Sequence, residues 1–235
     1  MKKNYTFNGY NNKVDLSDLD EEITFVEKGS PCGELLRRYW QPVILSEELG
    51  ELPKLVKILD EELVIFRDKS GQVGLLDKHC SHRGASLEYG IIADCGLICS
   101  YHGWHFDIDG TLLKAGSEPC KSPVHKRVKH GAYQTYEYEG IIFAYLGPPE
   151  KTPEFPLYDT QTNNDLLKIP FTIETPCNWL QVYENTQDPI HVIHLHARSS
   201  GVQFGVASGV DQIIEYDNTP LGMINIQTRL IDDHV

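Results

Sequence analysis

No segment of this sequence is apolar for long enough to cross a membrane. A membrane-spanning helix needs roughly 18 apolar residues in a row, and the apolar runs here are far shorter. The amino terminus, residues 1–6, carries positive charge but is not followed by the apolar core of a secretory signal. These two absences predict a cytoplasmic protein without a membrane partner.

Positive charge is also scarce. Lys and Arg number 21 against 34 Asp and Glu, which gives a net charge of −13. Nucleic-acid binding depends on basic side chains that neutralise phosphates, so no nucleic-acid partner is expected. The short basic stretch at residues 126–130 is interpreted as a solvated loop.

The cysteines show no disulfide pattern. Four of the six, Cys32, Cys95, Cys120 and Cys177, are scattered along the chain and are expected to be reduced thiols. The other two each stand close to a histidine, as described below.

The chain has 235 residues and 40% hydrophobic content, which is typical of one large globular domain or two ordinary ones. Residues 1–30 are polar and acidic, and we expect a loosely packed arm there. Ser30 and Pro31 then favour the start of a short helix, with Ser30 as its cap.

Short strands are expected in the middle of the chain. Residues 55–59 and 63–66 flank the polar residues 60–62, and this pattern predicts a hairpin. Further strands are expected at 73–76, 97–98, 106–108 and 141–146, with a turn at Asp109-Gly110.

The segment 147–156 is rich in proline and charge and is interpreted as a domain boundary. A helical stretch from Pro176 towards Arg198 and two strands within 212–231 follow it. We therefore predict a mainly β protein with some α structure, in three parts: an arm with a short helix (1–41), an all-β domain (42–149) and a further domain (150–235).

Two short strings, Cys80-Ser81-His82 and Cys99-Ser100-Tyr101-His102, carry the strongest functional signal. Sixteen residues separate them, and both lie next to glycines at expected strand ends. Two thiolates and two imidazoles at this spacing can hold a Rieske-type [2Fe–2S] cluster, with both Cys on one iron and both His on the other. Such a centre transfers one electron at a time.

Other interpretations of the same residues stay open. A Cys₂His₂ zinc site would use the same four side chains, although a C-x-H pair is unusual for zinc. Buried free cysteines beside surface histidines would need no metal at all. His79 and His105 lie beside the four residues at different spacings, and we expect supporting or surface roles for them.

These strings, each extended by several residues, resemble the Rieske domain of ring-hydroxylating oxygenases. Residues 33–42 upstream are similar to the phthalate-dioxygenase-like branch of that family. The likeness extends from about residue 25 to residue 200. It implies an all-β Rieske domain followed by the first part of an α+β, helix-grip-like catalytic domain.

A second candidate site lies in the expected helix. Asp188 and His191 are three residues apart and would share a helix face. A regular helix would favour His191 with His194, whereas His191 and His196 converge only if the helix breaks or loosens after about His194. A polar helix that happens to be rich in histidine is the plain alternative.

The resemblance selects among these possibilities. Residues 188–196 are similar to the D-x₂-H-x₄-H motif of the family's mononuclear iron site, which implies His191 and His196 as Fe(II) ligands. It also implies that Asp188 is not a ligand but links His191 to His102 of the neighbouring subunit in a homotrimer.

The family's third iron ligand is a carboxylate far downstream, in a C-terminal helix that this chain does not contain. The resemblance therefore predicts a C-terminally truncated chain and leaves open whether it is active alone. The remaining acidic residues stand in strand-like or turn-like sequence, and none is expected to replace that ligand: Asp211, Glu215, Asp217, Asp232 and Asp233.

The leading hypothesis is the oxygenase component of a Rieske non-haem iron oxygenase. Electrons from NAD(P)H would come through a separate flavin/iron–sulfur reductase, and O₂ would hydroxylate or O-demethylate an aromatic substrate, carboxylated or not. A Rieske-type electron-transfer protein without oxygenase activity is the alternative, but it leaves residues 176–198 unexplained.

Overall fold

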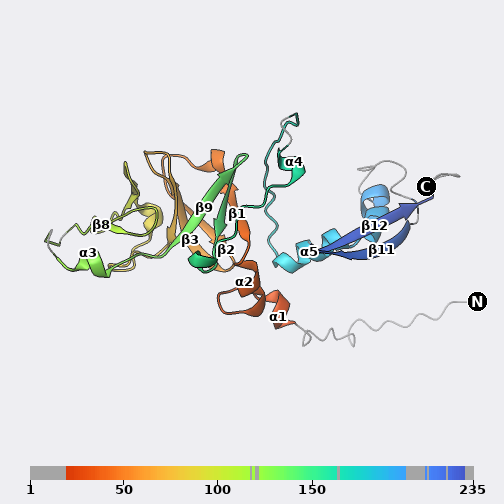
Figure 1. Cartoon of the computed structure of the whole chain (residues 1–235), viewed down its shortest axis with the longest axis horizontal. Helices are drawn as coiled ribbons and strands as arrows, with labels where there is room; N and C mark the ends of the chain where they lie inside the picture. The colour runs from red at the N-terminus through yellow and green to blue at the C-terminus, as the bar shows by residue number, and fades with distance from the viewer. Residues whose placement is uncertain are drawn as a thin grey trace, which may run out of the picture. The chain divides into compact units, whose positions relative to one another are not determined.

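The structure, a computed structural model, describes residues 20–116, 118–119, 122–162, 165–199, 210, 212–220 and 222–230. The chain divides into two compact units, Met1–Ile173 and Glu174–Val235, which are described separately (Figure 1). Predictions that concern residues 1–19, Cys120, Asp211, Asp232 and Asp233 lie outside the described residues.

A six-stranded antiparallel sheet forms the larger layer of the first unit. Its strands, in spatial order, are β1 (Trp40–Leu45), β10 (Ile141–Tyr145), β9 (Ala132–Tyr138), β4 (Val73–Asp77), β3 (Glu61–Arg67) and β2 (Lys54–Ile58). Pro42 lies in β1, at the edge of the sheet, beside a register shift. This position suits proline, because an edge strand can spare a backbone donor.

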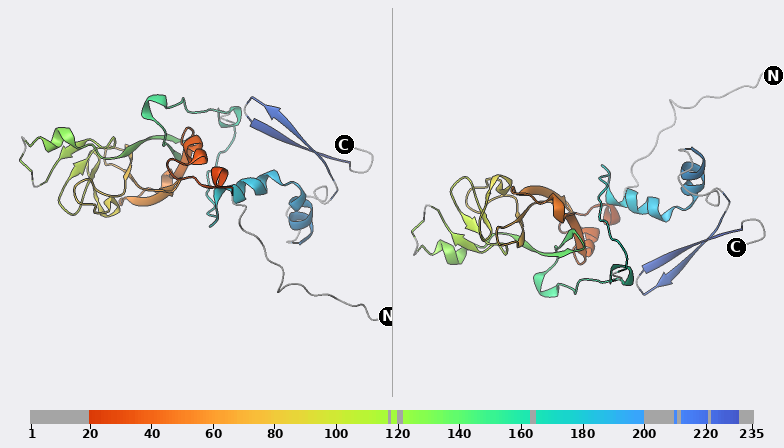
Figure 2. Two further views of the ribbon diagram at one scale, coloured as in Figure 1. Left: turned by 90° about the horizontal axis from the view of Figure 1, so that it is seen from below. Right: turned by 90° about the horizontal axis from the view of Figure 1, so that it is seen from above.

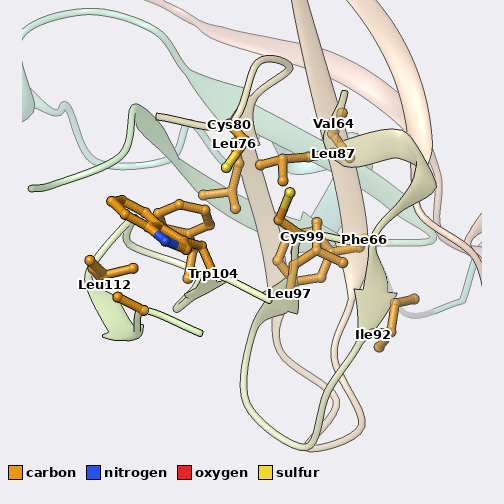
Figure 3. Close-up of a cluster of buried hydrophobic side chains, with 12 residues drawn as sticks. Val64, Phe66, Leu76, Cys80, Leu87, Ile92, Leu97, Cys99, Trp104 and Leu112 are labelled. Atoms are coloured by element: carbon orange, nitrogen blue, oxygen red, sulfur yellow. The ribbon is translucent and has the colours of Figure 1, made fainter. Parts of the chain in front are cut away.

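A smaller four-stranded sheet carries the two Cys/His strings in the loops around its strands. Its strands are β5 (Ile91–Ile92), β6 (Leu97–Ile98), β7 (His105–Phe106) and β8 (Leu112–Lys114). One hydrophobic core joins β3 and β4 to this sheet. It contains Phe66, Leu97 and Phe106, together with Cys80 and Cys99 from the two Cys/His strings (Figure 3). The expected all-β character of this region is confirmed.

Short helices complete the first unit, at its edges and between strands (Figure 1). They are α1 (Glu21–Thr24), α2 (Pro31–Leu36), η2 (Ser46–Glu48), η3 (Leu87–Tyr89), α3 (Val124–Arg127), η4 (Pro149–Lys151) and α4 (Asp159–Thr162). The predicted cap of α2 is confirmed, because the Ser30 hydroxyl accepts a hydrogen bond from the Gly33 N–H at 3.1 Å.

The β2–β3 hairpin is confirmed, but its predicted turn is wrong. Leu59 and Asp60 form the turn, with φ of 45° and 66°, and Ile58 pairs with Glu61. Glu61 lies in β3 rather than in the turn. There its carboxylate accepts hydrogen bonds from Arg37 and from the Tyr133 hydroxyl, both at 2.6 Å.

The segment after β10 is predicted from the sequence to belong to the further domain. In the structure it is part of the first unit and packs against the six-stranded sheet. The Phe155 ring contacts Tyr136 at a centroid distance of 4.4 Å and Phe143 at 4.9 Å. The Trp40 Nε1–H donates to the Pro153 carbonyl at 3.1 Å. The division of the chain falls after Ile173, and the functional limits 42–149 and 150–235 stay predictions.

The second unit contains α5 (Trp179–Gln187), the π-helix η5 (Val192–Ser199) and the antiparallel hairpin of β11 (Gln212–Thr219) and β12 (Gly222–Arg229). The helical stretch predicted from Pro176 towards Arg198 is present, but it is divided into two helices. The first, α5, ends at Gln187, and the chain changes direction before η5 begins (Figure 2). The two predicted strands are confirmed.

None of the described helices is both long and apolar enough to span a membrane. The cysteines of the described part of the chain, Cys32, Cys80, Cys95, Cys99 and Cys177, are all free of disulfides.

Candidate metal centres

The two Cys/His strings fold into loops with the same backbone design. In each loop the cysteine N–H donates to the carbonyl five residues later, and the glycine four residues after the cysteine donates back to the cysteine carbonyl. These bonds are Cys80 N to Ala85 O (2.9 Å), Gly84 N to Cys80 O (2.9 Å), Cys99 N to Trp104 O (2.7 Å) and Gly103 N to Cys99 O (3.0 Å). Gly84 and Gly103 both have positive φ, 70° and 67°, which glycine adopts without strain.

Both loop cysteines are buried, Cys80 at 3% and Cys99 at 2% exposure. Their sulfurs lie among apolar side chains such as Leu76 and Leu87 (Figure 3). Burial raises the pKa of Cys80 to about 11, and the neighbouring Cys99 thiol adds to this, while the backbone N–H of His82 opposes it. A thiol in such surroundings ionises readily only when a cation binds it.

The two histidines of the strings also meet. The His82 and His102 rings lie 4.6 Å apart, edge to face. His82 stacks on Trp104 at the same centroid distance, with the planes 7° apart. Its Nδ1 is buried and has no hydrogen-bond partner. Burial is the main cause that lowers the pKa of His82, and the charges of His102 and Arg83 lower it further. The neutral ring this favours is the form that binds metals.

These four side chains fit a two-iron cluster better than a single ion. Within the described ranges, no group of three or more His, Cys, Asp and Glu side chains is arranged to hold one metal ion. A Rieske cluster needs no such group, because each of its irons takes only two protein ligands. The paired buried thiols and the unpartnered Nδ1 of His82 match that requirement.

A buried histidine, His130, lies close to the first loop. The basic stretch 126–130 is predicted to be a solvated loop, but residues 126–127 belong to α3, and His130 is only 3% exposed. Its Nδ1 lies 2.7 Å from the hydroxyl of Ser81. Ser81 is the residue between the candidate ligands Cys80 and His82 in the sequence. No spacing rule links His130 to Ser81, which is 49 residues away.

His79 and His105 lie outside the paired rings. The His79 Nδ1 is 3.0 Å from the Gly84 carbonyl, and the His105 Nε2 contacts the Cys95 carbonyl. Both contacts are with backbone carbonyls, and the supporting or surface roles expected for these two histidines stay predictions.

The second candidate site lies where α5 ends. Asp188 follows the last helical residue with an extended backbone, and its carboxylate accepts a hydrogen bond from the Ile190 N–H at 2.9 Å. The other carboxylate oxygen is 3.6 Å from the His191 Nδ1, which is buried and has no hydrogen-bond partner. The helix therefore breaks at Asp188, earlier than the expected position after His194.

The π-helix determines which histidines meet. A π-helix repeats its hydrogen bonds from i to i+5, so residues five apart come close on one face. The His191 and His196 rings lie 5.3 Å apart, whereas His194 is exposed. Glu215 and Asp217, two of the acidic residues considered as substitute ligands, are part of β11.

A protein-family model described as the Rieske [2Fe-2S] domain matches residues 39–136. The tert-butanol monooxygenase / tert-amyl alcohol desaturase oxygenase subunit of Aquincola tertiaricarbonis is 49% identical over 191 residues, 80% of this chain and 41% of the relative. The phthalate 4,5-dioxygenase oxygenase subunit of Pseudomonas putida is 42% identical over 176 residues, 73% of this chain and 40% of the relative. This chain thus spans about two fifths of the length of each relative.

A solved structure is similar as well. The carbazole-bound oxygenase in the ferredoxin complex of carbazole 1,9a-dioxygenase is 30% identical, with a TM-score of 0.56, over 69% of this chain and 42% of that one. The family model, the relatives and this structure agree with one another. The chain therefore carries a Rieske [2Fe–2S] domain and belongs to the oxygenase, or alpha, subunits of the Rieske non-haem iron oxygenases.

Proposed function

We propose that this chain supplies the electron-transfer and iron-binding parts of an oxygenase component. Electrons from NAD(P)H reach it through a separate flavin/iron–sulfur reductase, and O₂ is used to hydroxylate or O-demethylate an aromatic substrate, carboxylated or not. The observation that carries the proposal is the pairing of two histidine sites in one chain: His82 with His102, and His191 with His196.

In this proposal Cys80 and Cys99 bind one iron of the cluster, and His82 and His102 bind the other. The bound cluster supplies one-electron transfer, and the mononuclear iron supplies O₂ activation. The residues around them have supporting roles. Trp104 is 4% exposed, and its ring keeps His82 in one orientation and excludes water from one face of that ring.

His191 and His196 are the proposed ligands of the mononuclear Fe(II). Asp188 is exposed enough, at 53%, to meet a second protein chain while its carboxylate lies 3.6 Å from His191. We assign it the family role of linking His191 to His102 of a neighbouring subunit in a homotrimer. A carboxylate between two imidazoles would fix the tautomer of both rings. The cytoplasmic location and the absence of a nucleic-acid partner, both predicted from the sequence, belong to the same proposal.

The names of the similar proteins support two substrate classes. Phthalate and carbazole are aromatic, and phthalate is also a dicarboxylate. The relative with 49% identity is named for tert-butanol and tert-amyl alcohol, which are saturated tertiary alcohols. That name favours a branched aliphatic alcohol as a second candidate substrate. The ferredoxin bound to the carbazole oxygenase supports an external iron–sulfur electron donor.

An electron-transfer protein without oxygenase activity is the competing proposal. It would need little more than the Rieske match at residues 39–136. It gives no reason for a π-helix that brings His191 to His196, and for that reason we favour the oxygenase.

The test is a turnover assay with the protein extended to the full length of its relatives, of which this chain spans about two fifths. The protein is loaded anaerobically with iron and sulfide and then incubated with a flavin/iron–sulfur reductase, NADH and O₂. Aromatic carboxylates, methoxylated aromatics and tert-butanol are supplied in separate arms. We expect substrate-dependent O₂ consumption and a hydroxylated or demethylated product in at least one arm, and its loss in the Asp188→Ala variant. Reduction of the cluster without O₂ consumption or product in any arm would favour the electron carrier.

A further inference from the structure

His130 joins two points of the first ligand loop. Its Nε2 lies 2.9 Å from the carbonyl oxygen of Asp77, the last residue of β4. Its Nδ1 lies 2.7 Å from the Ser81 hydroxyl oxygen, between Cys80 and His82. A single ring thus connects the point where the loop leaves the sheet to the residue between the two candidate ligands.

The partners of His130 fix the direction of both hydrogen bonds. A carbonyl oxygen can only accept, so the Nε2 carries the hydrogen and donates it to Asp77. Burial lowers the pKa of His130, and the hydrogen bond to Asp77 only partly offsets this, which favours the neutral ring. Its Nδ1 is then an acceptor, and the Ser81 hydroxyl donates to it. The hydroxyl hydrogen is therefore engaged by the His130 ring.

The same ring also contacts the second ligand loop. His130 stacks on Phe106 with centroids 4.6 Å apart, and Phe106 contacts Trp104 at 6.2 Å. Trp104 in turn stacks on His82. A continuous series of rings therefore runs from His130 to a candidate ligand of the first loop, through residues of the second loop.

The backbone leaves His130 little freedom to move. Its N–H donates to the Gly110 carbonyl at 2.8 Å, and the Gly131 carbonyl accepts from the Asp77 N–H at 2.9 Å. A Cβ atom on Gly131 would lie 1.8 Å from an Asp77 carboxylate oxygen. A side chain there would have to displace the Asp77 carboxylate, so the backbone after His130 lies close against the end of β4.

We propose that His130 is a positioning residue of the cluster site: it fixes the Ser81 hydroxyl and, through it, the loop that carries Cys80 and His82. The inference rests on the proposed cluster. Without His130 the hydroxyl could rotate and donate to a cluster sulfur, and added donors of this kind raise the reduction potential.

Three substitutions separate this role from general stabilisation. In His130→Gln, the amide nitrogen can replace Nε2 and keep the bond to Asp77, while the bond to Ser81 is lost. Ser81→Ala removes the same bond from the other side. Ser86→Ala is the matched control, because Ser86 lies in the same loop and its hydroxyl donates to the carboxylate of Glu88, at 2.8 Å, rather than to His130.

The measurements are made on the full chain loaded with iron and sulfide: the reduction potential, the g-values of the reduced state by EPR, and the half-life of the visible absorbance during heating. We expect His130→Gln to raise the reduction potential of the cluster and shift its g-values only in the protein that keeps Ser81. In the Ser81→Ala background the same substitution should change neither. Ser81→Ala should shorten the cluster half-life about fivefold, since one neutral hydrogen bond contributes about 1 kcal/mol, and Ser86→Ala should match the wild type.

Equal shifts from His130→Gln in both backgrounds, or none in either, would overturn the inference. If His130→Gln does not take up a cluster, the half-life of Ser81→Ala decides, and a value equal to that of Ser86→Ala overturns it. The wild-type arm separates the two levels of the argument. A wild type with a Rieske EPR signal but unaffected variants sinks only the role of His130, whereas a wild type without that signal sinks the proposed cluster as well.

Discussion

At the scale of single residues, one buried cation holds several segments of the first unit together. Arg37 is 3% exposed, and its guanidinium lies 2.6 Å from the Glu61 carboxylate and 3.0 Å from the Leu59 carbonyl. It therefore connects the end of α2 to the β2–β3 hairpin. Glu61 also accepts the Tyr133 hydroxyl, and burial together with this carboxylate raises the pKa of Tyr133.

Replacing Arg37 tests this network. Arg37→Met keeps most of the side-chain volume but leaves the partly buried Glu61 carboxylate without its cation. We expect the free energy of unfolding to fall by about 3 kcal/mol, the lower end of the cost of breaking a buried ion pair, because Glu61 is 21% exposed. Denaturant titration measures the change. Arg38→Met is the matched control, since Arg38 is exposed, and an equal effect of both substitutions would contradict the account.

Single residues also show how far the sequence could predict the first site. The spacing of the two short strings indicates the chemistry of their four candidate ligands, Cys80, His82, Cys99 and His102. These residues can therefore be predicted from the sequence alone. His130 has no such signal. Its partners Asp77 and Ser81 are 53 and 49 residues away, and only the pairing of β4 with β9 and the packing of the two sheets bring them together. The basic side chains of its neighbours Lys126, Arg127 and Lys129 predict a solvent-exposed loop instead.

At the scale of elements, aromatic packing holds the segment after β10 to the sheet of the first unit. Phe155 contacts Tyr136 and Phe143, and Trp40 lies 5.9 Å from it. The sequence predicted a boundary here from its prolines. It could not predict that the chain would return to the sheet, because a lone phenylalanine in a polar segment has no periodicity.

Phe155→Ala should release this segment. Loss of the ring removes contacts on several sides, and we expect a cost of about 2 kcal/mol, below the 3–5 kcal/mol of a fully buried phenylalanine. Limited proteolysis within residues 156–173 should become faster. Phe171→Ala provides the control, since Phe171 is 73% exposed. Unchanged cleavage in Phe155→Ala, or equal acceleration in both variants, would show that the ring does not hold the segment.

The π-helix η5 determines which two histidine rings of the second unit lie close together. A regular helix would favour His191 with His194, and nothing in the spacing alone predicts the change to an i to i+5 repeat. Only the family resemblance selected His196. The structure places the His191 and His196 rings 5.3 Å apart.

Metal binding by histidine variants tests that choice. Titration with Fe(II) under anaerobic conditions should show a weaker site in His191→Ala and in His196→Ala, by at least tenfold, because each loses one of few ligands. His194→Ala should bind Fe(II) like the wild type. Equal weakening by His194→Ala would instead indicate the pairing of a regular helix.

At the scale of the whole molecule, the two candidate centres belong to different compact units. The proposed cluster ligands lie in the first unit, and the proposed iron ligands His191 and His196 lie in the second. The sequence predicted this order along the chain, together with a mainly β fold. How the centres exchange electrons is assigned here to Asp188 and a neighbouring subunit, as a proposal. The cluster is the centre for which the chain holds every protein ligand, so the account depends on it first.

Reduced-state EPR of the full chain, with iron, zinc and acid-labile sulfide analysis of the same sample, tests that central claim most directly. We expect a coloured protein with a Rieske-type signal and two cluster irons and two sulfides per chain. We also expect His82→Cys or His102→Cys to move the signal towards that of an all-cysteine cluster. A colourless, zinc-containing protein without an EPR signal would contradict the account.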